Sequence, residues 1–227
     1  MTKISFKTAL LAAAPAFALA VSASPAQAQV SGIAVAEAAV AIASSTAVQN
    51  GLNQVGTTYA AQIQQIEQLS QQRQTQIQTL DTNGDGQLDQ NEQASLNENN
   101  PVIVQINQLD QQIQTATAPI QLARLYVVSQ VAQQYAPAVQ QVISDKNIQI
   151  MLSPEAVVYA PDAANVTQAV ADALNARVSS VQVTPPQGWQ PTQQAVDLFQ
   201  QVSQVFAIAR QQQAAAQQGG AAEVPSR

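Results

Sequence analysis

Cysteine and histidine are both absent from the 227-residue sequence. Without them the chain has no disulfide, no Ser-His or Cys-His catalytic pair, and no thiolate or imidazole metal site. Charged residues make up only 10% of the chain and aromatic residues only 4%. The remaining carboxylate, lysine and tyrosine side chains show no pair whose spacing suggests catalysis. We therefore expect a protein that is not an enzyme and that is extended, because so few aromatic residues rarely fill a large core.

Residues 1–28 have the pattern of a secretory signal peptide. Lys3 and Lys7 precede the apolar run ALLAAAPAFALAV, and the small residues of Ala-Gln-Ala, residues 26–28, form a cleavage site. The apolar run is too short to span a bilayer, and Pro15 interrupts it. We expect cleavage before Gln29, export, and no integral membrane segment in the mature chain. Its net charge of −8, from 6 basic and 14 acidic residues, argues against a nucleic-acid partner.

Two glutamine-rich runs have the periodicity of long helices, with apolar residues three and four positions apart. In residues 47–80 the apolar seam is Leu52, Val55, Tyr59, Ile66, Leu69 and Leu80, widened by Ile63 and Ile77, with Arg73 at one seam position. In residues 102–143 it is Ile106, Leu109, Ile113, Ala116, Ile120, Ala123 and Val127. Pro101 suits the first turn of the second helix, whereas Pro119 and Pro137 predict kinks. The pattern predicts an antiparallel helical hairpin over residues 47–143; the alternative is an ordinary pair of helices in the core of a bundle.

The segments that flank the hairpin have strand periodicity. Ile33 and Val35 predict a short first strand, and residues 148–152 predict a second strand that turns at residues 153–155 into a third, residues 157–159. A short helix follows, with its inward face formed by Val166, Ala169, Val170, Ala173 and Leu174. Because an antiparallel hairpin brings its ends together, residues 29–46 and 144–178 can form one β-rich body. The predicted fold class is α+β.

Residues 179–227 read as a C-terminal extension. The prolines and glutamines of residues 181–194 predict an extended linker, and Val196, Phe199, Val202 and Phe206 lie on one face of a further amphipathic helix. Trp189 is expected to pack its indole against a neighbour. The last residues, from 214 onward, are expected to be disordered. The helix can pack on the body or bind a partner.

The segment DTNGDGQLDQNE, residues 81–92, matches the calcium-binding loop of an EF-hand and lies between the two predicted long helices. A hard cation takes six to eight oxygen ligands, and this loop supplies them at alternating positions around a glycine that permits the sharp turn. The predicted Ca²⁺ ligands, one site per chain, are Asp81, Asn83, Asp85, the carbonyl of Gln87, Asp89 through water, and Glu92. The alternative is a solvated turn built on the Asn-Gly and Asp-Gly steps. The chain has no second loop of this kind, so modest affinity is expected.

The block from Tyr135 to Val178 resembles the C-terminal signature of the Skp/OmpH family of periplasmic chaperones for outer-membrane proteins. Its matching parts are Asp145-Lys146-Asn147 at a helix end, Val157-Val158-Tyr159-Ala160, and Asn165-Val166-Thr167, while GIAVAE near residue 32 resembles the opening strand of the family. Asn147 replaces the usual glycine, a mild change because asparagine tolerates the left-handed conformation. The resemblance implies a homotrimer in the periplasm whose helical hairpins surround an unfolded client.

The resemblance and the loop together predict a holdase chaperone for unfolded outer-membrane proteins, with a calcium loop at the tip of its helical arm. The alternative is a calcium-dependent scaffold or sensor of the cell envelope that binds a specific partner through the C-terminal helix. Family members often present a basic surface, but the predicted hairpin region here has only Arg73, Arg124 and Lys146. We therefore expect clients to be held by apolar contacts and amide hydrogen bonds rather than by charge.

Overall fold

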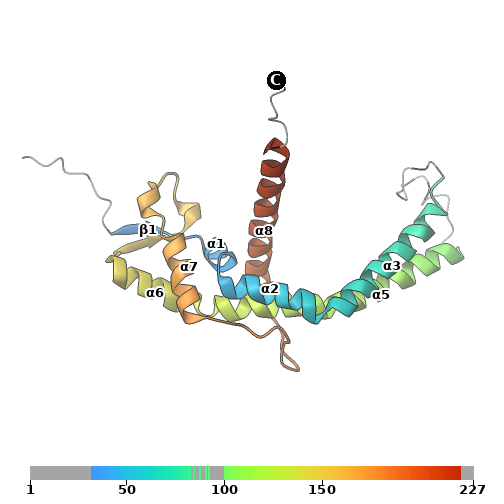
Figure 1. The fold of residues 1–227 in the computed structure, drawn as a ribbon, viewed down its shortest axis with the longest axis horizontal. Helices are drawn as coiled ribbons and strands as arrows, with labels where there is room; N and C mark the ends of the chain where they lie inside the picture. The colour runs from blue at the N-terminus through green and yellow to red at the C-terminus, as the bar shows by residue number, and fades with distance from the viewer. Residues whose placement is uncertain are drawn as a thin grey trace, which may run out of the picture. The chain divides into compact units, whose positions relative to one another are not determined.

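The computed structural model describes residues 32–82, 84, 87, 90, 92 and 100–220. The elements of this part of the chain are β1 (Ile33–Val35), α1 (Ala38–Ala43), α2 (Thr46–Thr58), α3 (Ala60–Gln78), α5 (Pro101–Ala132), α6 (Tyr135–Lys146), β2 (Ile150–Leu152), the short 3₁₀ helices η1 (Pro154–Ala156) and η2 (Asp162–Ala164), α7 (Thr167–Arg177) and α8 (Gln193–Gly220). The described residues are mostly helical with one small sheet (Figure 1). The predicted signal peptide lies outside them.

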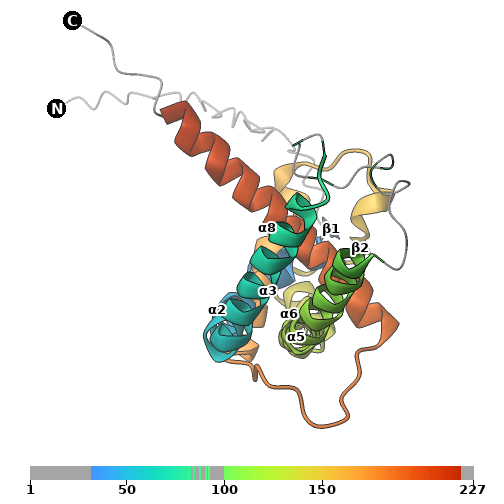
Figure 2. The same cartoon turned by 90° about the vertical axis from the view of Figure 1, so that its right-hand side faces the viewer.

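The two predicted long helical runs are confirmed. α2 and α3 follow one another along α5, and α3 lies beside the half of α5 that is farther from the sheet (Figures 1 and 2). We call α3 with this half of α5 the arm, and α2 with residues 120–132 of α5 the root. Asn100 caps α5, because its side chain accepts a hydrogen bond from the backbone N–H of Val102 at 2.9 Å. Pro101 occupies the first turn, as predicted.

Both helical runs are interrupted near the root. Tyr59 separates α2 from α3 with φ −105° and ψ 20°, outside the helical range. In the second run α5 continues through Pro119 to Ala132, and the interruption falls before Tyr135. The interruption expected at Pro137 is therefore present at Gln133 and Gln134, just before that proline, whereas the helix is not interrupted at Pro119. Pro137 lies in the first turn of α6, where a missing N–H removes no intrahelical hydrogen bond.

The sheet has two parallel strands. Ile33 pairs with Ile150, Ala34 with Met151 and Val35 with Leu152. On the other side of β1, the carbonyl oxygen of Val35 accepts a hydrogen bond from Val166 N at 2.9 Å. The strands are parallel because the chain leaves β1, travels out and back through the helices, and re-enters the sheet in the same direction.

The hairpin predicted over residues 148–159 is wrong. After β2 the chain turns through η1, and residues 157–159 form no strand. Pro154 has no N–H to donate and fixes the backbone for this turn, which is closed by a hydrogen bond from Ala156 N to Ser153 O at 3.1 Å. Residues 157–159 are therefore apolar residues that pair with no strand in the described part of the chain.

The core of the body forms where α1, α6, α7 and the end of α5 meet. Its fully buried side chains include Ile42, Val48, Val128, Val131, Val170 and Leu174. The prediction for α7 is confirmed, since Ala169 is partly buried against the core and the other four predicted residues are buried: Val166, Val170, Ala173 and Leu174. Asn147 ends α6 with φ 53° and ψ 42°, the left-handed conformation expected for it.

The predicted C-terminal helix is present as α8, and it packs on the body. Val202 is 1% exposed and joins the core, with Phe199 and Phe206 packed beside it. The expected disorder from residue 214 is wrong for residues 214–220, because α8 continues to Gly220. Alanine and glutamine are good helix formers, so the helix continues after its apolar face has ended. Residues 221–227 lie outside the described part of the chain.

Candidate functional site

The arm has a narrow apolar seam between two glutamine-rich outer faces. Leu69 on α3, and Ile106 and Leu109 on α5, are buried at this seam, and the flanking glutamines are mostly exposed. Arg73, the charged residue predicted at a seam position, pairs with Asp110 on the facing helix. The two side chains are 38% and 46% exposed, so the pair contributes at most about 1 kcal/mol. The arm is therefore held mainly by a thin line of apolar contacts.

The apolar cluster at the far end of the arm lies beside the predicted calcium loop. Ile77, Leu80 and Ile106 are buried together there. Directly after Leu80, Asp81 Oδ1 accepts a hydrogen bond from Gly84 N at 2.6 Å, and Gly84 has a φ of 79°. The turn from Asp81 to Gly84 therefore begins at the residue that follows the buried Leu80.

The last residue of the predicted loop folds back onto its start. Glu92 is 5% exposed, and its Oε1 accepts hydrogen bonds from Thr82 N at 2.6 Å and Thr82 Oγ1 at 2.9 Å. Of the six predicted ligands, Asp81, Gln87 and Glu92 are among the described residues, and Asn83, Asp85 and Asp89 lie outside them. Within the described residues no group of three or more acidic, histidine or cysteine side chains gathers at one point.

The segment between α7 and α8, residues 179–192, crosses the root of the arm, and we call it the strap (Figure 1). Its valines pack against an apolar surface of α2, the start of α3 and α5, and we call this surface the root groove. Its residues are Leu52, Val55, Tyr59, Ile63, Ile66, Ile120, Ala123 and Val127. Val183 is 7% exposed in this groove, and Val181 packs beside it. The intervening Gln182 and the following Thr184 are exposed. Alternate strap side chains thus point into the groove and into solvent.

Gly51 on α2 allows the strap to approach closely. A Cβ at this position would lie 2.6 Å from Val181 Cγ2 and 2.8 Å from Val127 Cγ1. Both separations are too short for carbon atoms in van der Waals contact. A glycine in the interior of a helix costs about 1 kcal/mol relative to alanine. At Gly51 this cost is offset by the packing of Val181 against the helix.

Gln130 on α5 holds the backbone of the strap. Its Nε2 donates to the carbonyl oxygen of Gln182 at 2.8 Å, and its Oε1 accepts from Gln182 N at 3.0 Å. One side-chain amide thus pairs with both backbone polar groups of a single residue, as a neighbouring β-strand would. These contacts depend on the backbone of residue 182 and not on its side chain.

Trp189 packs its indole against a neighbour, as predicted from the sequence. Its ring lies edge-on to that of Tyr126 on α5, with the centroids 4.9 Å apart and the planes at 65°. This geometry is favoured between aromatic rings, because the positive edge of one faces the negative face of the other. The contact fixes the end of the strap just before α8.

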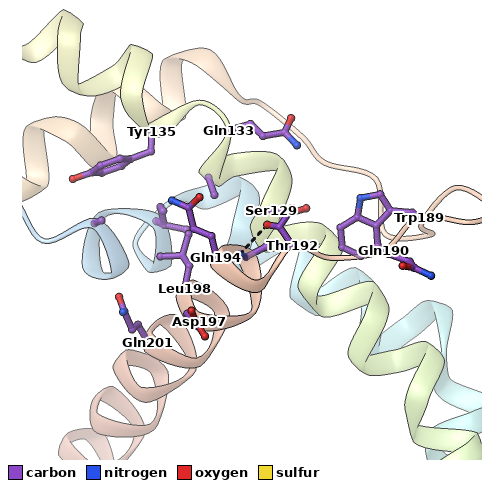
Figure 3. A pocket seen from close by; sticks show the side chains of 14 residues that line it. Ser129, Gln133, Tyr135, Trp189, Gln190, Thr192, Gln194, Asp197, Leu198 and Gln201 are labelled. Carbon is purple, nitrogen blue, oxygen red and sulfur yellow. Dashed lines mark hydrogen bonds between the residues drawn. The ribbon is translucent and has the colours of Figure 1, made fainter.

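A cavity of 590 Å³ lies between the end of the strap, the α5–α6 junction and the start of α8 (Figure 3). Tyr135 lines it, and burial raises the pKa of this hydroxyl above its ordinary value. Thr192 caps α8 at its rim, since its Oγ1 accepts from Ala195 N at 3.2 Å. The labelled side chains around the cavity are mostly amides and hydroxyls, and Asp197 is the charged residue among those that line it.

Large apolar side chains are exposed at the sheet end of the molecule. Ile33 is 38% exposed, Ile150 50%, Tyr159 84%, and Val158 is fully exposed. Ile33 and Ile150 are partners in the sheet, and the free segment that follows β2 carries the other two. Apolar residues gathered in one region in this way are typical of an interaction surface.

Apart from the packing of Trp189, the contacts of the strap were not predicted from the sequence. The signals that could have indicated them are the Val-x-Val spacing before a Pro-Pro pair and the unexplained glycine in the interior of a helix.

Among the described helices, none is both long and apolar enough to span a bilayer.

Comparisons with known proteins find one family and a similar structure. Residues 32–174 match the profile of the family described as outer membrane protein, OmpH-like. The crystal structure of an OmpH-like protein from Caulobacter crescentus is 19% identical, with a TM-score of 0.41, over 70% of this chain and 93% of that one. No curated protein matches the chain.

Proposed function

The chain belongs to the OmpH-like family of outer membrane proteins, and from that membership we propose that it is a non-enzymatic holdase chaperone of the periplasm. The observation that carries the proposal is the family match over residues 32–174, which spans the sheet, the arm and α7. The arm supports it, because its thin apolar seam and neutral amide faces suit weak contacts with many unfolded sequences. Clients would be unfolded outer-membrane proteins, held without chemical change.

The test is suppression of aggregation. An unfolded outer-membrane β-barrel protein diluted from urea should stay soluble when the mature protein is present, and light scattering should remain low. An unrelated helical protein of similar acidity is the control for nonspecific effects. Aggregation of several such clients at the same rate with and without the protein would overturn the proposal.

We propose that three copies associate through the sheet end. The exposed side chains of Ile33, Ile150, Val158 and Tyr159 support this, because a single copy leaves them in contact with water. In the described residues β2 also has no partner on its outer edge, and an unpaired edge can accept a strand from another chain. Light scattering should give the mass of a trimer. Val158→Glu should lower that mass, whereas Val104→Glu, at an exposed valine of α5, should leave it unchanged.

We also propose that residues 81–92 bind one Ca²⁺ ion per chain. Asp81, Asn83, Asp85, the Gln87 carbonyl, Asp89 and Glu92 would be the ligands, an all-oxygen set of the kind that Ca²⁺ prefers. The return of Glu92 to Thr82 supports the proposal, because the twelfth position of such a loop must lie near its start. Bound Ca²⁺ would neutralise the carboxylates and order the connection at the tip of the arm.

Isothermal titration of the mature protein with Ca²⁺ tests this site. Heat of binding at one ion per chain is expected, and Glu92→Gln should weaken it strongly, because the amide cannot supply two anionic oxygens. Hydrogen exchange with and without chelator should then differ in residues 75–105 and agree elsewhere. An absence of heat together with an unchanged melting temperature would refute the site.

A second candidate function is a calcium-dependent envelope scaffold or sensor that holds a specific partner through α8. One observation favours it: residues 207–217 of α8 are exposed along their whole length. Removing the entire C-terminal extension cannot distinguish the two functions, because Val183 and Val202 are buried. Truncation after Arg210 removes residues 211–217, which are all exposed, together with the residues that follow them. A holdase should retain full activity after it, whereas a scaffold should lose its partner.

A further inference from the structure

The strap lies against α2 and α5 as a bound peptide would, although it forms no strand and its backbone bends at residues 183 and 184. Val181 and Val183 point into the root groove, and Gln182 and Thr184 face solvent. The root groove therefore holds a short segment in which apolar side chains that face the helices alternate with polar side chains that face solvent. The strands of outer-membrane β-barrels have this same alternation, because one face meets lipid and the other meets the lumen.

The contacts that hold the strap are largely independent of its sequence. Gln130 recognises the N–H and C=O of Gln182 and does not contact a particular side chain for this purpose. Any extended residue other than proline could present the same two groups. The groove walls are aliphatic or aromatic, so apolar side chains other than valine could replace Val181 and Val183.

From these contacts we infer that the root groove is a binding site for client segments of alternating polarity, and that the strap occupies it in cis when no client is bound. The inference rests on the proposed holdase function and names the part of the molecule that would hold the client. The strap then acts as a built-in competitor. Only a client segment that makes both the apolar contacts of the root groove and the hydrogen bonds to Gln130 can displace the strap, so client binding is selective.

The test uses a fluorescein-labelled peptide of residues 179–186, Ser-Ser-Val-Gln-Val-Thr-Pro-Pro. Val183→Ser should loosen the strap and leave the groove walls intact. We expect this variant to bind the peptide at least tenfold more tightly than the wild type. Adding Gln130→Ala should remove most of that gain. Val104→Ser, at a valine that is 43% exposed on α5, is the matched control and should behave as the wild type.

Trp189 provides a second measurement on the unaltered protein. It is the single tryptophan of the chain, and the peptide contains none, so tryptophan emission reports on the strap alone. Saturating peptide should separate Trp189 from Tyr126 and shift its emission to longer wavelength. A peptide with serine at both valine positions should cause no shift.

The outcomes separate this inference from the proposed function. Equal peptide affinity of the wild type and a folded Val183→Ser variant would overturn the inference, and so would an unshifted Trp189 emission at saturating peptide. If either occurs while the wild type still suppresses aggregation, clients bind elsewhere on the chaperone. If the peptide displaces the strap but no client is kept soluble, the proposed function fails instead.

Discussion

Gly51 and Gly56 make a matched pair for testing how closely the strap is packed. Both lie in α2, and alanine at either position should gain about 1 kcal/mol of helix propensity. Apart from its chain neighbours and the backbone of its own helix, no described atom lies within 4 Å of the position that a Cβ would take at Gly56. Gly56→Ala should therefore raise the free energy of unfolding by about 0.5–1 kcal/mol.

At Gly51 the new methyl group meets atoms that cannot easily move. It would lie 2.6 Å from Val181 Cγ2 and 2.8 Å from Val127 Cγ1, and both Cγ atoms of Val127 are within 3.3 Å. Overpacking of this kind costs about 1–3 kcal/mol, which exceeds the gain in helix propensity. We expect Gly51→Ala to lower the free energy of unfolding by about 1 kcal/mol, so that the two variants differ in sign.

Urea denaturation followed by circular dichroism at fixed protein concentration measures both changes. Because the strap should be pushed outward, Gly51→Ala should also alter the emission of Trp189, and Gly56→Ala should not. A Gly51→Ala variant as stable as Gly56→Ala, with native Trp189 emission, would refute the close packing of strap and helix.

Three further predictions follow from single residues. Ser45→Ala should raise the free energy of unfolding by about 1 kcal/mol, because the fully buried Ser45 hydroxyl has no hydrogen-bond partner among the described residues. If denaturation instead shows a lower free energy of unfolding for this variant, the hydroxyl caps α2 and the reasoning is wrong. Asn147→Gly should be tolerated, whereas Asn147→Val should cost about 1–2 kcal/mol, because its φ of 53° disfavours a branched side chain; equal melting temperatures would contradict this. Burial raises the pKa of the Tyr135 hydroxyl, so the folded state favours its neutral form. The stability that this preference contributes is complete below about pH 10, the ordinary pKa of tyrosine. It is lost as the pH rises through the pKa of Tyr135 in the folded state. Tyr135→Phe should therefore reduce the fall in melting temperature above that pH, and an unchanged alkaline profile would count against the burial.

The parts of the fold that depend on local pattern could be predicted from the sequence. The seam positions, the first-turn role of Pro101 and the left-handed Asn147 each follow from helical periodicity or from the preference of one residue. The predicted return strand at residues 157–159 failed because alternation indicates only an extended chain. The outer edge of β2 is free in the described residues, but the chain turns through η1 at Pro154 and does not return along that edge.

The strap could not be predicted because its contacts join distant parts of the chain. Gln130 and Gln182 are 52 residues apart, and nothing in the neighbourhood of either residue specifies the other. Gly51 gave a hint, since a glycine in the interior of a helix calls for an explanation, but several kinds of close neighbour could supply it. For the candidate calcium loop the reverse holds: its spacing is entirely local, so all six proposed ligands are predictions from the sequence alone.

The parallel pairing of β1 with β2 has a consequence for the order in which the molecule folds. Glu37, just after β1, donates its N–H to Thr167 Oγ1, a residue 130 positions later, and Thr46 N likewise reaches Asn175 across 129 positions. Closing such long loops is slow, whereas α3 and α5 can pair across a short connection. During synthesis β1 therefore stays unpaired until most of the chain, including β2, has been made. Pulse-labelled hydrogen exchange during refolding should accordingly protect the arm before β1.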